Sequence, residues 1–408
     1  MRWFTCAFLL GCAGGEDSPA GGVPVSDSSA VVVDSAIADS GTLNIDAPDA
    51  PAETSFLPDA ACATATAEAK TEILPVDIIW MVDNSASMEP AVAEIKAGLN
   101  AFASLIAAKK LDYKVIMLAL RSKASPITVA GSLRYPVCIP PPLAGDDNCG
   151  NGPRFFHSHI DVKSTQPLEQ FLGSLDQTEG YKVGQERGAE PWKAQLRPSA
   201  SRTIVVVTDD NSRLSATELE TFAGGKNPFN SLILPPGLLD ASRAGMFTGY
   251  LFAALYGWGS ATDPTVKCKY SDGTFPPSAG PTYTTLVAKT GGPRAKICDG
   301  KAGWTPFFEA IATAVAKTAK LACELALPVP STGTLDPSAV NVKVADALIP
   351  KVANAAACGT SVAWYYDNDL TPTKVMLCPA ACDAANASVG VDKPGKIEIL
   401  FGCKTVIK

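Results

Sequence analysis

Short apolar runs alternate with longer stretches in which apolar residues recur every three to four positions. The runs at residues 76–82, 113–120, 203–207 and 247–255 are continuous enough to be strands that are buried on both faces. Between the first two runs, the spacing predicts an amphipathic helix with a buried stripe of Val92, Ile95, Leu99, Phe102 and Ile106. Strands that alternate with helices indicate an α/β fold built on a doubly wound, mainly parallel sheet.

Further elements are predicted from weaker signals. Residues 127–133 are expected to form a third strand, and the Ser215-x-x-Glu218 capping box starts a helix. We also predict a short helix that is capped by Ser164 or Thr165. Its apolar residues are Leu168, Phe171, Leu172 and Leu175. A last long helix is predicted from Trp304, with a buried stripe of Phe308, Ile311, Ala312 and Val315.

An irregular insertion interrupts this pattern at residues 135–160. It contains Cys138, Cys149, three consecutive prolines and a Gly-Asp-Asp-Asn turn. Proline and glycine at this density predict a loop. We expect a disulfide between Cys138 and Cys149 to hold the loop at the rim of the sheet, where it would shape a binding surface.

The pattern changes again in residues 324–408. Four short β runs are separated by proline and glycine turns, at residues 340–344, 362–366, 374–377 and 396–401. We predict a small, disulfide-rich β module, because a core of this size is marginal without covalent links.

The N-terminal part has a different character. Residues 1–12 resemble a bacterial lipoprotein signal, which implies lipidation of Cys12 and anchoring in the cell envelope, at the outer membrane or the periplasmic face. An ordinary secretory signal is the alternative. Residues 13–71 carry ten acidic side chains and are rich in Ala, Ser and Asp, a composition typical of a flexible acidic tether.

The charge distribution limits the classes of partner. The chain has a net charge of −7, of which residues 13–69 contribute −10 and Arg2 contributes +1, so residues 70–408 carry +2. No clustered basic face is evident, which argues against nucleic acid. The membrane contact that we expect is through the lipid alone.

Cysteine usage indicates an oxidising compartment. Apart from Cys6 and Cys12, ten of the twelve cysteines remain, and an even number behind an export signal predicts up to five disulfides. Their pairing is open. Zinc at Cys378 and Cys382 is the rival interpretation, although no second cysteine pair or nearby histidine completes four ligands.

Oxygen-bearing side chains follow two of the predicted strands. Residues 76–82 run into Asp83-x-Ser85-x-Ser87, and residues 203–207 run into Thr208-Asp209. The carboxyl ends of parallel strands meet at one edge of a sheet, so these side chains are expected to lie together as a site for a hard cation such as Mg²⁺, with Mn²⁺ or Ca²⁺ as alternatives. A simple strand-to-helix turn, in which Ser87 caps the helix, is the other interpretation.

These motifs resemble the metal-ion-dependent adhesion site of von Willebrand factor A domains. The resemblance covers residues 72–323 and includes a helix that ends in Thr290-Gly291-Gly292. Asp210 stands where the family has glycine. The order of tether, metal domain and cysteine-containing tail resembles von Willebrand factor A lipoproteins of myxobacteria and their relatives.

The resemblance implies a set of metal ligands. In the family, two serine hydroxyls bind the cation directly, carboxylates on two loops complete the shell, and a threonine adds a further hydroxyl. Carried over to this chain, the set is Asp83, Ser85, Ser87, Thr178 and Asp209. Thr165 is the alternative for the threonine.

The function implied is adhesion rather than catalysis. We expect an envelope-anchored binding protein that captures a protein or other ligand with an exposed carboxylate, which completes the shell of the cation. One alternative is an exported metal-dependent hydrolase that uses His157, His159 and Asp161. A structural surface lipoprotein with a non-functional metal site is another.

Overall fold

A computed structural model describes residues 65–67, 74–318, 321–327, 336–390, 393–394, 397–401 and 405–408. The predicted signal with Cys12, almost all of the predicted tether, and Cys62 and Cys403 lie outside the described residues.

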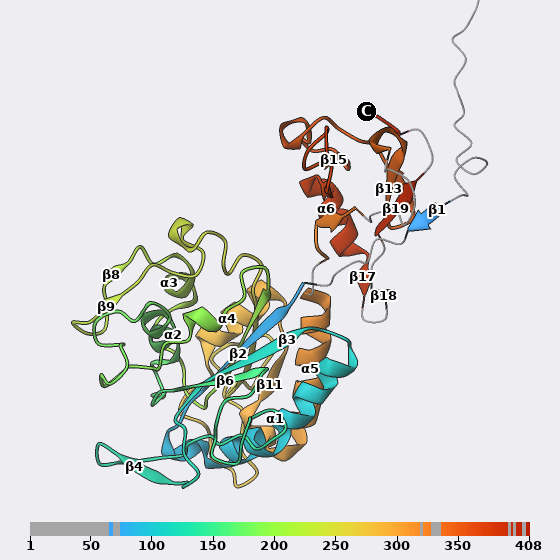
Figure 1. Cartoon of the computed structure of the whole chain (residues 1–408). Helices are drawn as coiled ribbons and strands as arrows, with labels where there is room; N and C mark the ends of the chain where they lie inside the picture. Colours follow the sequence, from blue (N-terminus) through green and yellow to red (C-terminus); the bar gives the residue numbers. More distant parts are fainter. Residues whose placement is uncertain are drawn as a thin grey trace, which may run out of the picture. The chain divides into compact units, whose positions relative to one another are not determined.

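The central feature is a sheet of six strands in the order β11-β10-β7-β2-β3-β6 (Figure 1). All its neighbouring strands are parallel, as the sequence predicts for an α/β fold. The strands are β2 (Val76–Val82), β3 (Tyr113–Ala119), β6 (Phe155–His159), β7 (Ser201–Val207), β10 (Leu251–Tyr256) and β11 (Arg294–Lys296).

The direction of winding reverses at the pair formed by β2 and β7. From β2 the chain moves outward through β3 to β6, then returns to the other side of β2 and moves outward again through β7, β10 and β11. In open α/β sheets, ligand sites occur beyond the carboxyl ends of the strands at such a switch point. Asp83 and Thr208 are the first residues after the two strands.

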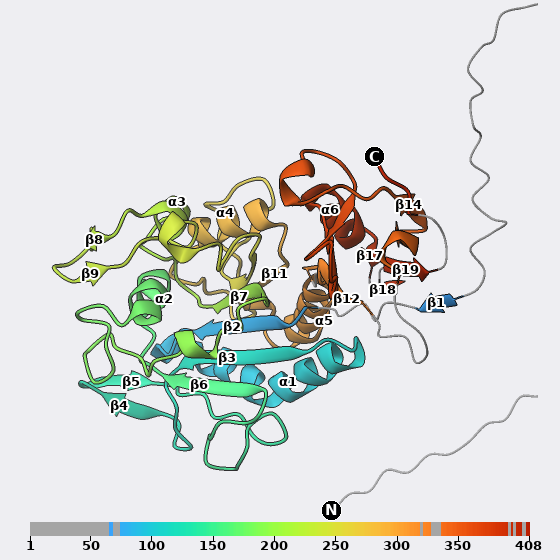
Figure 2. The same ribbon diagram turned by 45° about the horizontal axis from the view of Figure 1, so that its top comes forward.

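Helices cover both faces of the sheet. They are α1 (Glu89–Ala108), preceded by the short η1 (Ala86–Met88), α2 (Pro167–Asp176), α3 (Ala216–Thr221), α4 (Pro281–Thr290) and α5 (Lys301–Thr318). Figure 2 shows α2, α3 and α4 on the opposite side of the strands from α1. The prediction of a doubly wound sheet flanked by helices is therefore confirmed.

Alternate residues of β2 enter two different cores. Ile78 and Trp80 pack with α1 and α5, whereas Ile79 and Met81 pack with α2, α3 and α4. Every residue of β2 is buried, which explains why all its residues except Asp77 are apolar.

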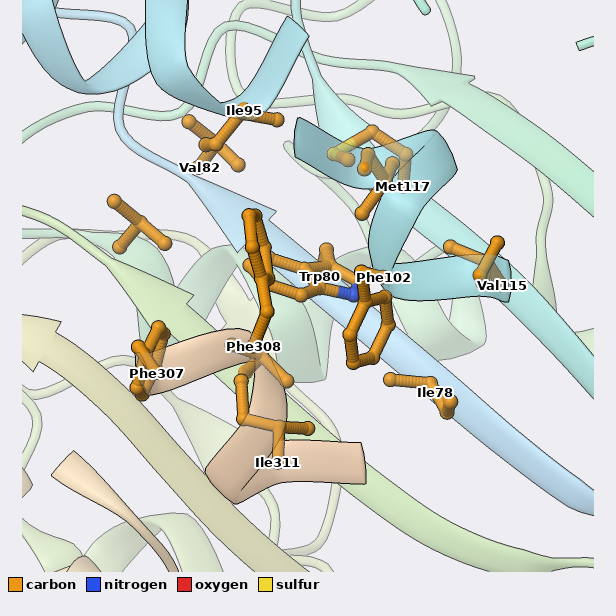
Figure 3. Packing of buried hydrophobic residues seen from close by; sticks show 14 of the residues in the cluster. Ile78, Trp80, Val82, Ile95, Phe102, Val115, Met117, Phe307, Phe308 and Ile311 are labelled. Atoms are coloured by element: carbon orange, nitrogen blue, oxygen red, sulfur yellow. The ribbon is translucent and has the colours of Figure 1, made fainter. Parts of the chain in front are cut away.

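Aromatic rings fill the core between β2, α1 and α5 (Figure 3). The centroid of Trp80 lies 5.4 Å from that of Phe102 and 5.9 Å from that of Phe308. Gly98 allows this packing, because a Cβ atom there would lie 2.3 Å from Cε2 of Phe308. Among the described residues, Ala86–Ala108 is the helical stretch that is long and apolar enough to span a membrane, and its large apolar residues pack in this core.

The predicted third strand is wrong. Residues 127–134 form a separate hairpin of β4 (Ile127–Val129) and β5 (Ser132–Arg134), whose side chains are half-buried or exposed. Ala130 and Gly131 make its turn with positive φ angles of 48° and 79°, a backbone that favours a tight two-residue hairpin. The strand that pairs with β3 is instead β6. Its sequence Phe-Phe-His-Ser-His contains three polar residues, so no strand was predicted there.

Helix starts are confirmed in part. Ser215 and Glu218 make both hydrogen bonds of the predicted capping box at α3. The predicted caps of α2, Ser164 and Thr165, are wrong, since the N-cap is Gln166 and no side chain caps the helix. The last long helix begins at Lys301, before the predicted Trp304.

Disulfides hold the long loops. The predicted bond between Cys138 and Cys149 is confirmed. The side chain of Asn100 in α1 binds the same insertion, because its Nδ2 donates to the carbonyl oxygen of Pro140 at 2.9 Å and its Oδ1 accepts from the amide of Leu143 at 3.0 Å.

Three further pairs lie at disulfide distance, namely Cys268–Cys298, Cys323–Cys382 and Cys358–Cys378. Cys378 and Cys382 therefore have different partners, and the zinc interpretation of this pair is wrong.

The C-terminal residues form two small antiparallel sheets with their own core. One has the order β1-β19-β13-β14 and the other β12-β16-β15. The strands are β1 (Ala65–Ala67), β12 (Glu324–Ala326), β13 (Val340–Val344), β14 (Ala347–Ile349), β15 (Trp364–Tyr366), β16 (Lys374–Leu377) and β19 (Ile397–Phe401). Short pairs are β8 (Gly225–Lys226) with β9 (Ile233–Leu234) and β17 (Val389–Gly390) with β18 (Lys393–Pro394).

Two features of this part differ from the prediction. Residues 65–67, within the predicted tether, pair with β19 and fill an edge of its sheet. In addition, α6 (Pro379–Ala387) is a helix where only a β module is expected, and its buried Ala381 and Ala385 are small enough to let it pack closely on the strands.

A buried ion cluster fixes the amino end of β2. The carboxylate of Asp77 is fully buried and accepts hydrogen bonds from Arg197 Nε and Arg202 Nη1, each at 2.8 Å. A buried carboxylate is tolerated only when such partners replace the lost water.

Removing one of these partners should destabilise the domain. We expect Arg202→Met to lower the free energy of unfolding by about 3 kcal/mol, because Asp77 keeps Arg197 but loses its most buried partner. Urea unfolding measures this change. The matched control is Lys193→Met, which removes an exposed pair with Asp176 and should cost at most about 1 kcal/mol. Equal effects of the two substitutions would contradict the assignment.

Candidate functional site

The loops after β2 and β7 meet at the carboxyl edge of the sheet. The amide of Asp83 donates to the carbonyl oxygen of Val207 at 3.0 Å, and Thr208 Oγ1 donates to Asp83 Oδ2 at 2.9 Å. Asp209 follows Thr208 and lies close enough to Asp83 for its charge to act on that carboxylate. The two acidic loops, far apart in the chain, therefore come together as the sequence predicts.

Two serine hydroxyls lie over these carboxylates. The amide of Ser85 donates to Asp83 Oδ1 at 2.8 Å, which folds the loop back on the strand end. The hydroxyl oxygens of Ser85 and Ser87 are 3.3 Å apart, and Ser87 lies close enough to Asp209 to lower the pKa of that carboxylate, against the larger effect of burial. Ser87 is exposed and Ser85 is half-buried, whereas both carboxylates are buried.

The electrostatics of the cluster are unfavourable without a cation. Burial raises the pKa of Asp83 to about 7, and the neighbouring charge of Asp209 adds to this effect. Burial also raises the pKa of Asp209, with a further contribution from Asp210. Oδ1 of Asp209 is buried and has no hydrogen-bond partner within the part of the chain that the structure describes. A carboxylate oxygen in this state is a free acceptor for a cation.

The donor set fits a hard divalent ion. It combines two hydroxyls with two carboxylates, and all of these ligands are oxygen atoms, as Mg²⁺, Mn²⁺ and Ca²⁺ prefer. No group of three or more His, Cys, Asp or Glu side chains that could hold a metal occurs among the described residues. A site here would thus depend on the hydroxyls and on water for its remaining ligands.

Thr178 does not join this cluster. It follows the carboxyl end of α2, where its amide donates to the carbonyl oxygen of Gly173 at 3.1 Å. Thr165, the alternative, precedes the amino end of α2, and its carbonyl oxygen accepts from the amide of Arg213 at 2.9 Å. Because α2 is ten residues long, about 15 Å separates its two ends. Only the end with Thr165 lies on the side of the metal-site loops.

Asn84 is a positioning residue that the sequence analysis did not single out. Its buried side chain accepts from the amides of Leu120 and Val162 at 2.9 Å and 3.2 Å and donates to the carbonyl oxygen of Tyr135 at 2.9 Å. It thereby joins the loops that follow β2, β3, β5 and β6. Its place between Asp83 and Ser85 was the signal that could have identified it.

The histidines of the hydrolase alternative have other contacts. His157 is fully buried, its Nε2 lies 3.1 Å from a strand carbonyl oxygen, and burial lowers its pKa to about 3. His159 Nδ1 accepts from the amide of Arg121 at 3.0 Å, and Asp161 pairs with Arg134 at 2.8 Å. These contacts fix the edge of the sheet.

No protein-family model matches this sequence, and no curated protein matches it significantly.

The buried carboxylates should give the metal-free protein a distinct pH dependence. The folded state holds a proton on Asp83 up to about pH 7, whereas the unfolded chain releases it near the ordinary pKa of 3.8. This contribution to stability is complete below pH 3.8 and is lost as the pH rises through about 7. Its size is at most about 4 kcal/mol, at ~1.4 kcal/mol per pKa unit.

Urea unfolding in a chelator at a series of pH values tests this expectation. Asp83→Asn should remove this part of the pH dependence, because the amide mimics the protonated acid. If the free energy of unfolding of this variant depended on pH as strongly as that of the wild type, the assignment of the raised pKa to Asp83 would be wrong.

Proposed function

We propose that residues 74–318 form a von Willebrand factor A-type domain that binds Mg²⁺, or Mn²⁺ or Ca²⁺ in its place. Ser85 and Ser87 would bind the cation directly, and Asp83 and Asp209 would complete its shell, in part through water. The observation that carries this proposal is that both acidic loops meet with two hydroxyls beside Oδ1 of Asp209, which has no hydrogen-bond partner in the described part of the chain.

The ligand chemistry supports capture of an acidic partner. Hydroxyl ligands bring no negative charge, so the bound cation would remain electrophilic and keep at least one position open to exchange. A carboxylate from a protein or another ligand would take that position. Without the cation, the negative charges of Asp209 and Asp210 would repel such a ligand, and this makes capture dependent on the metal.

We include Thr165 in place of Thr178 as the further hydroxyl. Its loop is fixed next to the site by the bonds between Asn84 and Val162, whose amide and carbonyl groups both contact Asn84. Three loops at the switch point would then supply ligands.

We propose that the protein acts in an oxidising compartment of the bacterial cell envelope. Four cysteine pairs at disulfide distance support export. Anchoring through a lipid on Cys12 rests on the N-terminal resemblance, and secretion is the alternative. Binding rather than catalysis is favoured because His157 is buried and neutral.

Isothermal titration of the full chain with Mg²⁺ and Mn²⁺ tests the metal site. We expect one binding site per chain. Asp83→Ala should abolish binding, and Ser87→Ala should lower the affinity for Mg²⁺ about tenfold, because losing an interaction worth ~1.4 kcal/mol changes the dissociation constant by that factor. The matched control is Ser104→Ala, an exposed serine of α1 whose hydroxyl bonds to its own helix.

Two results would contradict the proposal. Absence of divalent binding to the wild type would favour a structural protein with a non-functional site. Stoichiometric zinc that is lost in His157→Ala would instead favour the hydrolase.

A further inference from the structure

A small pocket opens directly beside the candidate metal site. It lies between the first turns of α1 and α5 and has a volume of about 170 Å³. Its lining includes Ser87, Ala93, Glu94, Tyr270, Lys301 and Trp304. Ser87 therefore belongs both to the candidate metal site and to the wall of the pocket.

The far wall is held by a covalent link. Tyr270 lies on the loop between β10 and α4, and Cys268 on this loop is joined to Cys298, in the short helix η4 (Ile297–Asp299) before α5. Gly300 then turns the chain into α5 with a φ of 52°. Tyr270 is half-buried and close enough to Asp209 for that carboxylate to help raise its pKa, after the larger effect of burial. The same tyrosine thus borders the metal site and the pocket.

The pocket has an apolar floor and charged sides. Trp304 and Ile297 are only 3% and 9% exposed and form the floor. Lys301 lies at the rim and has no ion-pair partner among the described side chains. Pockets that hold whole small ligands usually have volumes of about 300–1,000 Å³. This pocket is smaller, so it suits a single side chain.

We propose that this pocket is the specificity subsite for the partner of the metal site, an inference that rests on the proposed function. The partner is an acidic polypeptide segment that places its Asp or Glu on the cation and an aromatic or branched apolar side chain in the pocket. That side chain lies one or two residues from the acid, because an extended chain advances about 3.3 Å per residue and Ser87 borders both positions.

Two observations favour a polypeptide over an acidic polysaccharide. The buried Trp304 offers a floor and not an open ring face on which a sugar could stack. The loop that carries Tyr270 also exposes the large apolar residues Phe275 and Val266, at 56% and 42%, which suits contact with a protein surface. Lys301 and Glu94 place one charge of each sign in the lining, so the attraction for an acidic segment comes from the cation of the metal site.

The test uses two synthetic peptide pools with the full-length protein. In one pool a central Glu is flanked by Phe, Tyr or Leu, and in the other by Gly or Ser. Binding is followed by fluorescence polarisation in Mg²⁺ and in chelator. We expect Mg²⁺-dependent binding with at least a tenfold preference for the apolar pool.

A pair of variants assigns this preference to the pocket. Ala93→Trp should fill the pocket and abolish the preference while Mg²⁺ affinity stays unchanged. Ala97→Trp is the matched control, because Ala97 is also exposed, lies one turn further along α1 and is outside the lining. It should keep the wild-type preference.

The outcomes separate the two proposals. Equal Mg²⁺-dependent binding of both pools, or a preference that survives Ala93→Trp, overturns the subsite and leaves the metal site standing. Mg²⁺ binding without affinity for either pool, but with affinity for an acidic polysaccharide such as alginate, overturns the polypeptide partner. Absence of Mg²⁺ binding overturns the proposed function itself.

Discussion

The parallel pairing of β2 with β7 is the constraint on which the rest of the structure depends. The two strands are adjacent although more than a hundred residues separate them, and their register places Val82 opposite Val207. The loops that carry Asp83 and Asp209 must therefore begin at the same level of the sheet. Two buried cores, one on each face, hold this register, since a slip of one residue would exchange the side chains between faces.

This register brings two carboxylates into buried positions, where a negative charge is energetically unfavourable. Both are buried, both have raised pKa values, and Oδ1 of Asp209 has no hydrogen-bond partner among the described residues. Asp77, at the other end of β2, is equally buried but is paired with two arginines. The contrast between the two ends of one strand supports the proposal that the acidic end binds a cation.

The loops around the site are held more firmly than their composition suggests. Asn84 joins four of them through its side chain and backbone, and disulfides tie the 135–160 insertion and the loop of Tyr270. A rim of fixed loops costs less entropy on binding than a mobile rim. The proposed site and pocket are thus both presented on a rigid edge.

The sequence alone determined the elements whose pattern is strong. The fully buried strands β2, β3 and β7, the stripe of α1, the capping box of α3 and the Cys138–Cys149 bond follow from periodicity, capping chemistry and cysteine spacing. The positions of Asp83 and Asp209 at the carboxyl ends of β2 and β7 were also predictable, because both lie within two residues of a strand with a strong apolar run.

Only the tertiary structure decided the rest. The edge strand β6 contains the buried polar residues His157 and Ser158, so its sequence does not show the apolar run of the other strands, and residues 127–134 form a hairpin outside the sheet. Thr178 and Thr165 are similar as sequence, but they lie at opposite ends of α2, and helix direction is set by the crossover from β6 to β7. The pocket beside Ser87 joins residues of α1, α5 and a disulfide-linked loop, and local patterns carry no information about such long-range contacts.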